Sequence, residues 1–160
     1  MVFSTISSII SLIFFHLEGD KSFVITNWIS SGSLNVDWSL NSNLLTVTMI
    51  IMVNFVSTLI HVYSVGYMSK DPRRIIFMGY LGLFTFFMLF LVSSSNLIQL
   101  FVGWEGVGLT SYLLIGFWSH KDEANKASLK AFVANRVGDF GLLISLFTIF
   151  IVFGTININE

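Results

Sequence analysis

Residues 75–118 decide the fold class, and they read IIFMGYLGLFTFFMLFLV (75–92), SSSN (93–96) and LIQLFVGWEGVGLTSYLLIGFW (97–118). A single charged residue, Glu105, interrupts these two apolar runs, and a short polar bend separates them. A helix needs about 20 apolar residues to cross the hydrocarbon core of a bilayer. The stretch therefore predicts two membrane-spanning helices joined by a tight turn.

Three more apolar runs cover residues 2–17, 44–67 and 129–153. Only 11% of the residues are charged and the mean hydropathy is +0.82, whereas a soluble domain has about 25% charged residues. Backbone in lipid must satisfy its own hydrogen bonds, and none of the runs alternates as barrel strands do. The sequence predicts an all-α integral membrane protein of about five helices, forming a single membrane domain over residues 1–160.

Residues 18–43 form the one long connection between apolar runs. Within it, residues 21–29 and 34–40 contain β-branched and aromatic side chains on either side of the polar segment 30–33. This pattern is typical of a β-hairpin. We expect the hairpin to lie on the membrane surface.

The loop charges predict the orientation. With five spans, the loops 69–74 and 119–127 share one side and hold five basic residues, whereas the opposite side has Lys21 alone. The positive-inside rule places these basic loops and the N-terminus in the cytoplasm or matrix, and the hairpin and C-terminus outside. The basic residues are Lys70, Arg73, Arg74, Lys121 and Lys126.

Three ionisable residues, Glu105, Arg136 and Asp139, lie well inside apolar runs. A charge at the centre of a membrane helix costs about 2.5–3.5 kcal/mol on insertion scales, so such residues are candidate functional sites. Glu105 either exchanges protons or makes a hydrogen bond between helices. Arg136 and Asp139 are three positions apart on one helix face and can pair, either to permit insertion or to take part in a proton path.

Other residues have simpler interpretations. The glycines in the segment 103–108 permit close packing of helices and loosen the helix locally. His61 relays protons or packs near the interface, and Lys130 reaches the basic surface along its apolar stem. The tryptophans fit the aromatic belts at the two interfaces; they are Trp28, Trp38, Trp104 and Trp118.

Several functional classes are excluded or disfavoured. The net charge is −1, which argues against nucleic acid as a partner. The chain has no cysteine, so it cannot hold thiolate metal sites or iron–sulfur clusters. The segment 103–108 follows no strand, so it is not a nucleotide-binding loop. No spacing of metal ligands is present, and we expect no cofactor and no metal on this chain.

Four segments resemble a known family: 59–68 (LIHVYSVGYM), 103–108 (GWEGVG), 111–118 (SYLLIGFW) and 130–139 (KAFVANRVGD). They look like subunit 5 of the proton-pumping NADH:ubiquinone oxidoreductase, respiratory complex I, in the antiporter-like subunit family. The resemblance extends from the hairpin region to the end of the chain. The Trp-Glu-Gly-Val-Gly and Arg-x-Gly-Asp motifs occur in the family's order.

The resemblance implies specific roles. Glu105 matches the family's membrane-embedded glutamate, Arg136 its arginine and Asp139 its aspartate, and all three take part in proton translocation. Flavin and iron–sulfur clusters are expected in partner subunits. The resemblance also implies the mitochondrial inner membrane, a hairpin on the intermembrane-space side, and contacts with lipid and other membrane subunits of complex I.

The chain also departs from the family. It resembles only the second to sixth helices, and the lysine that partners the glutamate is missing. The chain is then either a truncated piece or the N-terminal product of a split mitochondrial gene. The cut falls in a loop after a complete helix, which favours the split gene, and we expect a companion chain with the remaining helices. Asn43 stands where the family has an aspartate. Two alternatives remain open: a fragment of a multisubunit sodium/proton antiporter, and a structural membrane subunit without transport.

Overall fold

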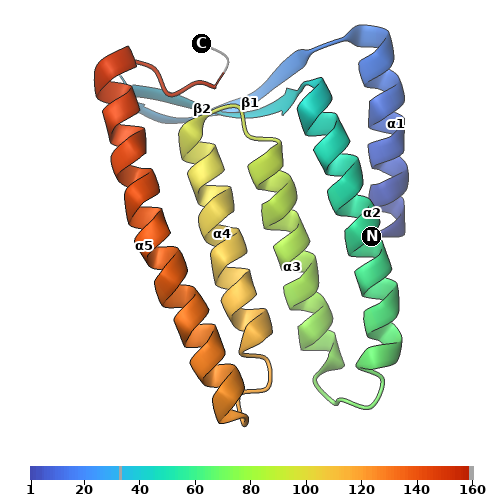
Figure 1. Ribbon diagram of the computed structural model, residues 1–160. Coiled ribbons are helices and arrows are strands. Elements are labelled where there is room, and N and C mark those ends of the chain that lie inside the picture. The colour runs from blue at the N-terminus through green and yellow to red at the C-terminus, as the bar shows by residue number, and fades with distance from the viewer. Residues whose placement is uncertain (33, 159–160) are drawn as a thin grey trace.

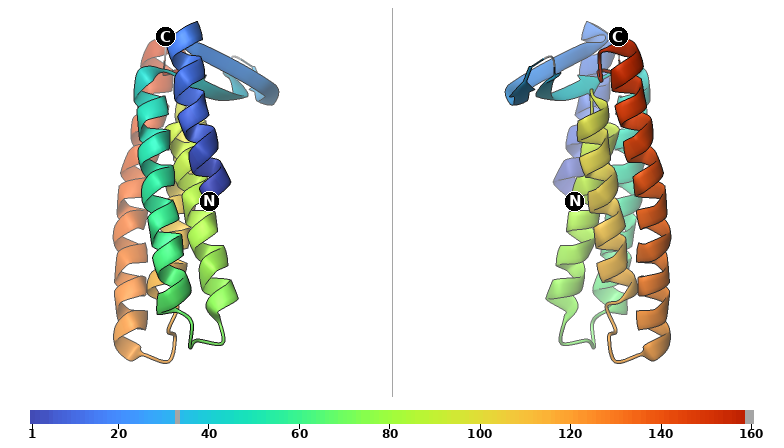
Figure 2. Two further views of the ribbon diagram at one scale, coloured as in Figure 1. Left: turned by 90° about the vertical axis from the view of Figure 1, so that its right-hand side faces the viewer. Right: turned by 90° about the vertical axis from the view of Figure 1, so that its left-hand side faces the viewer.

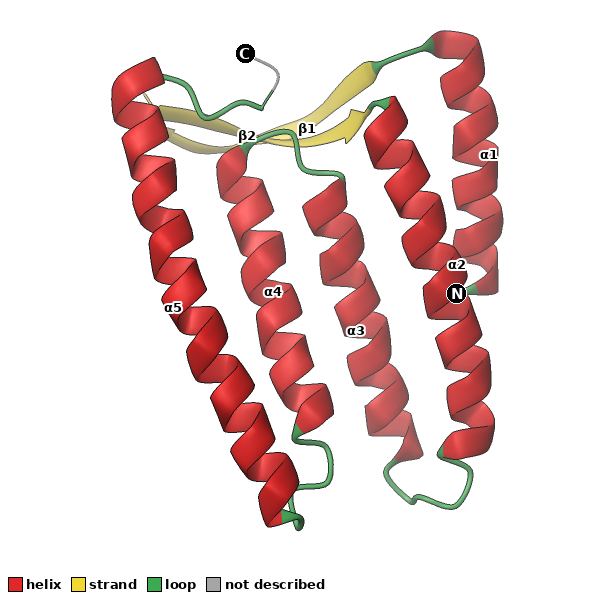
Figure 3. Ribbon diagram, in the orientation of Figure 1, coloured by secondary structure: helices red, strands yellow, loops and turns green. Residues whose placement is uncertain are grey.

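The computed structural model describes residues 1–32 and 34–158, which form five helices and one β-hairpin (Figures 1 and 3). The predicted mainly helical class with a hairpin after the first helix is confirmed. In chain order the elements are α1 (Val2–Glu18), β1 (Lys21–Ser31), β2 (Leu34–Ser42), α2 (Leu44–Tyr67), α3 (Arg74–Val92), α4 (Leu97–Ile115) and α5 (Asp122–Phe153).

The helices stand side by side in sequence order, and each packs chiefly on its neighbours along the chain (Figures 1 and 2). The result is a row one helix thick. Most large apolar side chains are exposed on it, whereas buried positions on α2 to α4 include Asn54, Thr85 and Gln99. This distribution is that of a membrane protein, in which polar side chains join the helices and apolar ones face outward.

Four helices, α2 to α5, are long and apolar enough to cross a bilayer. The first predicted span, α1, is shorter. The Thr5 hydroxyl lies 2.7 Å from that of Thr58, and Ser4 donates to Asn54 at 2.7 Å. These contacts place the start of α1 beside the middle of α2, so α1 covers only part of the depth of the row (Figure 1).

Two helix boundaries differ from the prediction by more than one residue. α4 ends at Ile115 rather than at residue 118, and α5 begins at Asp122 rather than at residue 129. Asp122 and Glu123 occupy the first turn of α5, where carboxylates interact favourably with the helix dipole. The helix has 32 residues. At about 1.5 Å per residue it exceeds the roughly 30 Å hydrocarbon core, so its charged first turns extend into the interface.

Asparagine side chains cap two of the helices. Asn43 Oδ1 accepts the Thr46 backbone N–H at 2.8 Å, and Asn96 Oδ1 accepts the Gln99 N–H at 2.8 Å. A carboxylate oxygen can cap a helix equally well. Asn43 therefore retains a polar role that the aspartate of the family would also perform.

The polar bend between α3 and α4 forms hydrogen bonds with two other parts of the chain, the hairpin and the segment that follows α5. On one side Asn41 N donates to Ser93 O at 2.9 Å, and Asn96 Nδ2 donates to Asp37 O at 2.8 Å. On the other side the segment 155–158 bonds to the bend, with Leu97 N to Ile156 O at 3.0 Å. The hairpin, the bend and the chain after α5 thus form one hydrogen-bonded cover at this end (Figure 3).

Candidate functional site: an intramembrane charge cluster

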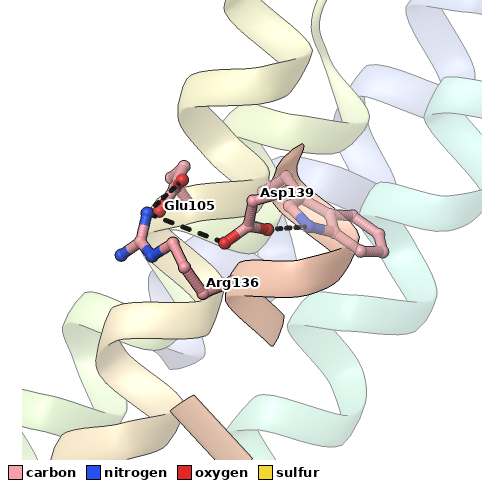
Figure 4. A network of polar contacts seen from close by, with 4 residues as sticks. Glu105, Arg136 and Asp139 are labelled. Carbon is pink, nitrogen blue, oxygen red and sulfur yellow. Dashed lines mark hydrogen bonds and ion pairs between the residues drawn. The ribbon is translucent and has the colours of Figure 1, made fainter. Parts of the chain in front are cut away.

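The site forms where the middle of α4 meets α5. Glu105 on α4 and Arg136 on α5 form an ion pair, with 2.6 Å between Oε1 and Nη1 (Figure 4). Arg136 Nη1 also lies 3.7 Å from Asp139 Oδ2, one turn further along α5. The structure therefore brings together all three ionisable residues that the sequence singled out. It confirms the expected pairing within α5 and adds the stronger contact between helices.

Trp104 holds the other oxygen of Asp139. Its indole Nε1 donates to Asp139 Oδ1 at 2.9 Å (Figure 4). The Asp139 side chain is only 7% exposed, and its second oxygen, Oδ2, has the Arg136 guanidinium 3.7 Å away as an ion-pair partner. The interpretation of Trp104 as a belt residue did not include this contact, because the spacing of tryptophans along a sequence does not reveal which indole faces a carboxylate on another helix.

Two glycines bring α4 against α3. A Cβ at Gly103 would lie 2.7 Å from the Leu91 Cα, and a Cβ at Gly106 would overlap the Phe87 ring. Gly108 points instead towards Asn135 on α5, with ordinary clearance. The prediction of close packing is confirmed at Gly103 and Gly106. α4 is nevertheless continuous from Leu97 to Ile115, so the expected loosening of the helix is not observed.

The cluster opens outward from the row of helices. The Arg136 side chain is 53% exposed and that of Glu105 is 28% exposed. The Arg136 guanidinium lies 5.0 Å from the Phe132 ring centre and lines a shallow depression on α5 with Val133, Val137 and Phe140. A half-exposed guanidinium at this depth needs protein or water around it.

The charges of the cluster do not balance. It contains two carboxylates and one guanidinium, so the ionised cluster carries one excess negative charge. Placing a net charge inside a membrane is unfavourable. Either a proton or a further cation restores neutrality, and the cluster is therefore able to take up a proton when no such cation is near.

His61 and Lys130 do not join the cluster. His61 Nδ1 lies 2.8 Å from Ser57 O within α2, a helix that packs on α1 and α3. Lys130 is exposed near the start of α5. Across residues 1–32 and 34–158 no group of three or more histidine or acidic residues is arranged to hold a metal ion.

The class of protein that these features indicate is a polytopic helical membrane protein with an acid–base cluster between two spans. Comparison with known proteins identifies the family within this class. Residues 28–78 match the family model for NADH-Ubiquinone oxidoreductase (complex I), chain 5 N-terminus. Residues 94–160 match the model for NADH:quinone oxidoreductase/Mrp antiporter, TM.

Individual relatives agree with these models. The chain is 50% identical over 151 residues to NADH-quinone oxidoreductase subunit L of Rickettsia bellii, covering 92% of this chain and 24% of the relative. It is 49% identical to NADH-ubiquinone oxidoreductase chain 5 of Chondrus crispus, covering 95% and 23%. For chain 5 of Triticum aestivum the identity is 50%, covering 96% and 23%.

The chain belongs to the family of antiporter-like membrane subunits that comprises complex I chain 5 and subunit L. It spans about a quarter of the length of these relatives. The alignment extends over nearly all of its own residues. The resemblance carried by the motifs at 103–108 and 130–139 is thereby confirmed.

Proposed function

We propose that this chain forms the N-terminal part of a proton-translocating membrane subunit of mitochondrial complex I. The observation that carries the proposal is the ion pair between Glu105 and Arg136, with Asp139 as a second ion-pair partner of the same guanidinium. In it, three ionisable groups share a site within the membrane-spanning region. NADH oxidation, with its flavin and iron–sulfur clusters, belongs to partner subunits.

The excess negative charge explains how the cluster handles a proton. Opposite charges stabilise each other's ionised forms, and loss of a neighbouring cation favours protonation of a carboxylate. In this proposal a lysine from the remaining helices approaches Glu105 and withdraws again. Its approach expels a proton and its withdrawal draws one in. Arg136 and Asp139 keep Glu105 at the position where this exchange occurs.

The exposed surface of α5 supports a companion that carries further helices. Large apolar side chains recur on it with alternating spacings of three and four residues, the period of a helix-packing seam. Arg136 lies beside this seam and is half exposed. Further helices of the subunit, on a companion chain, would cover both, and other complex I subunits and lipid would surround the rest. The seam consists of Val133, Val137, Phe140, Ile144, Phe147 and Ile151.

The location follows from the same proposal. The chain lies in the mitochondrial inner membrane with the hairpin on the intermembrane-space side. The two loops rich in lysine and arginine lie together at the end opposite the hairpin (Figure 1). This arrangement supports the orientation that the positive-inside rule assigns.

The test is the substitution Glu105→Gln in complex I reconstituted into vesicles. Gln retains the size of the side chain and removes its charge. We expect fewer protons translocated per NADH oxidised, while electron transfer to quinone persists. The matched control is Glu123→Gln, the same replacement in the first turn of α5 outside the cluster. An unchanged proton stoichiometry in Glu105→Gln would refute the role of Glu105.

A second candidate is a subunit of a sodium/proton antiporter complex, because the model matching residues 94–160 includes Mrp antiporters in its description. The matching chain 5 N-terminal model over residues 28–78 favours complex I. A purely structural subunit is the third candidate. Mass spectrometry of the proteins that copurify separates these: complex I brings flavin and iron–sulfur proteins, and a structural role predicts no partner bearing the lysine helix.

A further inference from the structure

A second polar site lies at the basic end of the row, away from the charge cluster. The ends of α3, α4 and α5 enclose a cavity of about 310 Å³. It has polar side chains from all three helices and the loop between α4 and α5. The residues on which the argument depends are Arg73, Ile76, Tyr80, Tyr112, Ser119 and Asn125.

Arg73 supplies the cavity with a positive charge. Its guanidinium carbon lies 5.0 Å from the centre of the Phe117 ring, which holds the group by a cation–π contact. Asp71 is the neighbouring acid, and its two oxygens accept the Arg73 backbone N–H at 2.8 Å and the Trp118 indole at 3.1 Å. In the part of the chain that the structure describes, no carboxylate forms an ion pair with the Arg73 guanidinium.

Neutral hydroxyls complete the lining. Tyr80 on α3, Tyr112 on α4 and Ser119 in the loop are among the residues that line it. None of these hydroxyls bonds to another residue within 1–32 and 34–158. Asn125 is already engaged, since its Nδ2 donates to Ser119 O at 2.6 Å. A guanidinium with three uncommitted hydroxyls is a set of donors that suits phosphate oxygens.

The position of the cavity at the end of the helices favours the phosphate of a lipid headgroup over a free phosphate ion. The apolar part of α3 begins at Ile75, directly after Arg73 and Arg74, and Ile76 lines the cavity and is 50% exposed. The loops 69–74 and 119–127 carry five basic residues against three acidic ones. The cavity therefore has a cationic rim on the aqueous side and an apolar edge on the membrane side, and basic pockets between spans at this side of a membrane bind lipid headgroups.

We propose that this cavity binds the phosphate group of an anionic phospholipid. Arg73 donates to the phosphate oxygens, the phenols of Tyr80 and Tyr112 orient them, and the acyl chains leave past Ile76. The site is independent of proton exchange at Glu105, so either proposal can fail without the other.

The experiment uses the intact complex in phosphatidylcholine vesicles that contain a minor amount of a photoactivatable phosphatidylglycerol. Cross-linked peptides covering residues 73–80 and 112–128 are quantified by mass spectrometry. Arg73→Gln removes the charge from the cavity. Arg74→Gln is the matched control, since it removes one charge from the adjacent, exposed position outside the cavity. Tyr112→Phe removes a phenol hydroxyl without changing the charge. This variant tests the cavity if Arg73→Gln prevents assembly of the complex.

We expect labelling of the wild-type complex and of Arg74→Gln, a several-fold loss in Arg73→Gln and a smaller loss in Tyr112→Phe. Phosphatidylcholine carries the same phosphate together with a choline cation, which the basic rim of the cavity repels. A photoactivatable phosphatidylcholine should therefore label these peptides several-fold less. Equal labelling by the two lipids, or equal labelling of all the variants, would overturn the proposal. Displacement of the lipid probe by inorganic phosphate alone would also overturn it, because the site would then recognise a free anion.

Discussion

The Asp139 carboxylate is held from two sides, by the Trp104 indole on α4 and by Arg136 on its own helix. The first contact is a hydrogen bond to Oδ1, and the second is an ion pair with Oδ2. The guanidinium that they align is the one that binds Glu105. Trp104 thus acts on the proposed proton-exchanging residue indirectly, by positioning Asp139 and, through it, Arg136.

Replacing Trp104 with Phe tests this arrangement. Phe keeps an aromatic ring but leaves Asp139 Oδ1 without its donor, and a hydrogen bond to a charged group is worth about 1.5–3 kcal/mol. We expect a lower free energy of unfolding and a proton stoichiometry with altered pH dependence. The comparison is Trp28→Phe on the exposed hairpin, measured in the same reconstituted complex. A pH profile identical to wild type would show that Trp104 only fills space.

Asp71 offers a pH prediction outside the membrane. The backbone N–H of Arg73, and next the Trp118 indole, lower the pKa of Asp71 below its ordinary value of 3.8. Because the folded state has the lower pKa, the stabilisation is complete above the ordinary value. It is lost as the pH falls through the lowered folded-state pKa.

The measurement is the fluorescence of Trp118 in a variant whose other three tryptophans are phenylalanine. We expect a transition with its midpoint below 3.8, and we expect Asp71→Asn to abolish it. A midpoint at or above the ordinary aspartate value would contradict the contact between Asp71 and Trp118.

Among the elements, α4 has two different contact faces. One face carries Gly103 and Gly106 and lies against α3, whereas the other presents Trp104 and Glu105 to α5. Close approach on the first face determines where the second face stands. The glycines are therefore part of the geometry of the site although they touch none of its charges.

Gly103→Ala should separate α4 from α3. The added Cβ would meet the Leu91 backbone, which cannot rotate away as a side chain can. Overpacking of this kind costs about 1–3 kcal/mol. Gly141→Ala on α5 is the control, since open space surrounds that position and alanine favours a helix. Thermal unfolding of the complex should show a loss for Gly103→Ala only, and an equal effect of both changes would contradict this packing.

Asn96 and Asn43 provide a second matched pair. Both cap a helix through Oδ1, but Asn96 is 1% exposed and also donates Nδ2 to Asp37 O. At either position, replacement by aspartate keeps an oxygen that can cap the helix and removes the amide group that donates a hydrogen bond. Asn96→Asp should therefore destabilise the attachment of the hairpin, and hydrogen exchange of residues 34–42 should accelerate. In Asn43→Asp the same exchange should stay unchanged, and acceleration in both variants would count against the role of Asn96.

At the scale of the whole molecule, the row of helices places the hairpin and the segment 155–158 at one end and both basic loops at the other (Figure 1). Most of the large apolar side chains of the row are exposed. These side chains need lipid or further helices around them, which agrees with a chain that spans about a quarter of its relatives.

The sidedness can be measured directly because the chain has no cysteine of its own. Single cysteines at Ser30 in the hairpin and Ser69 in the first basic loop occupy exposed positions. In mitoplasts, an impermeant maleimide should label Ser30→Cys readily, and Ser69→Cys only after the membrane is permeabilised. Labelling of both cysteines in intact mitoplasts would refute the orientation.

Much of this molecule is predictable from its sequence. The apolar runs specify the helices because a backbone in lipid has few alternatives, and Glu105, Arg136 and Asp139 stand out because charges are rare there. The helix end at Ile115 was less predictable, since residues 116–118 are as apolar as the span before them. The early start of α5 was missed because its first turns are charged, and interfacial helix is polar like a loop.

Local composition and spacing are enough to predict the membrane class, the hairpin, the basic end and the three ionisable residues. The partners of these residues depend on how the helices pack. Arg136 binds Glu105 more closely than it binds Asp139, and Asp139 receives the Trp104 indole. The physical reason is that these contacts depend on how α4 and α5 are rotated and how far they are offset. The close approach of Gly103 and Gly106 to α3 contributes to that geometry, and it becomes visible only once the helices are packed.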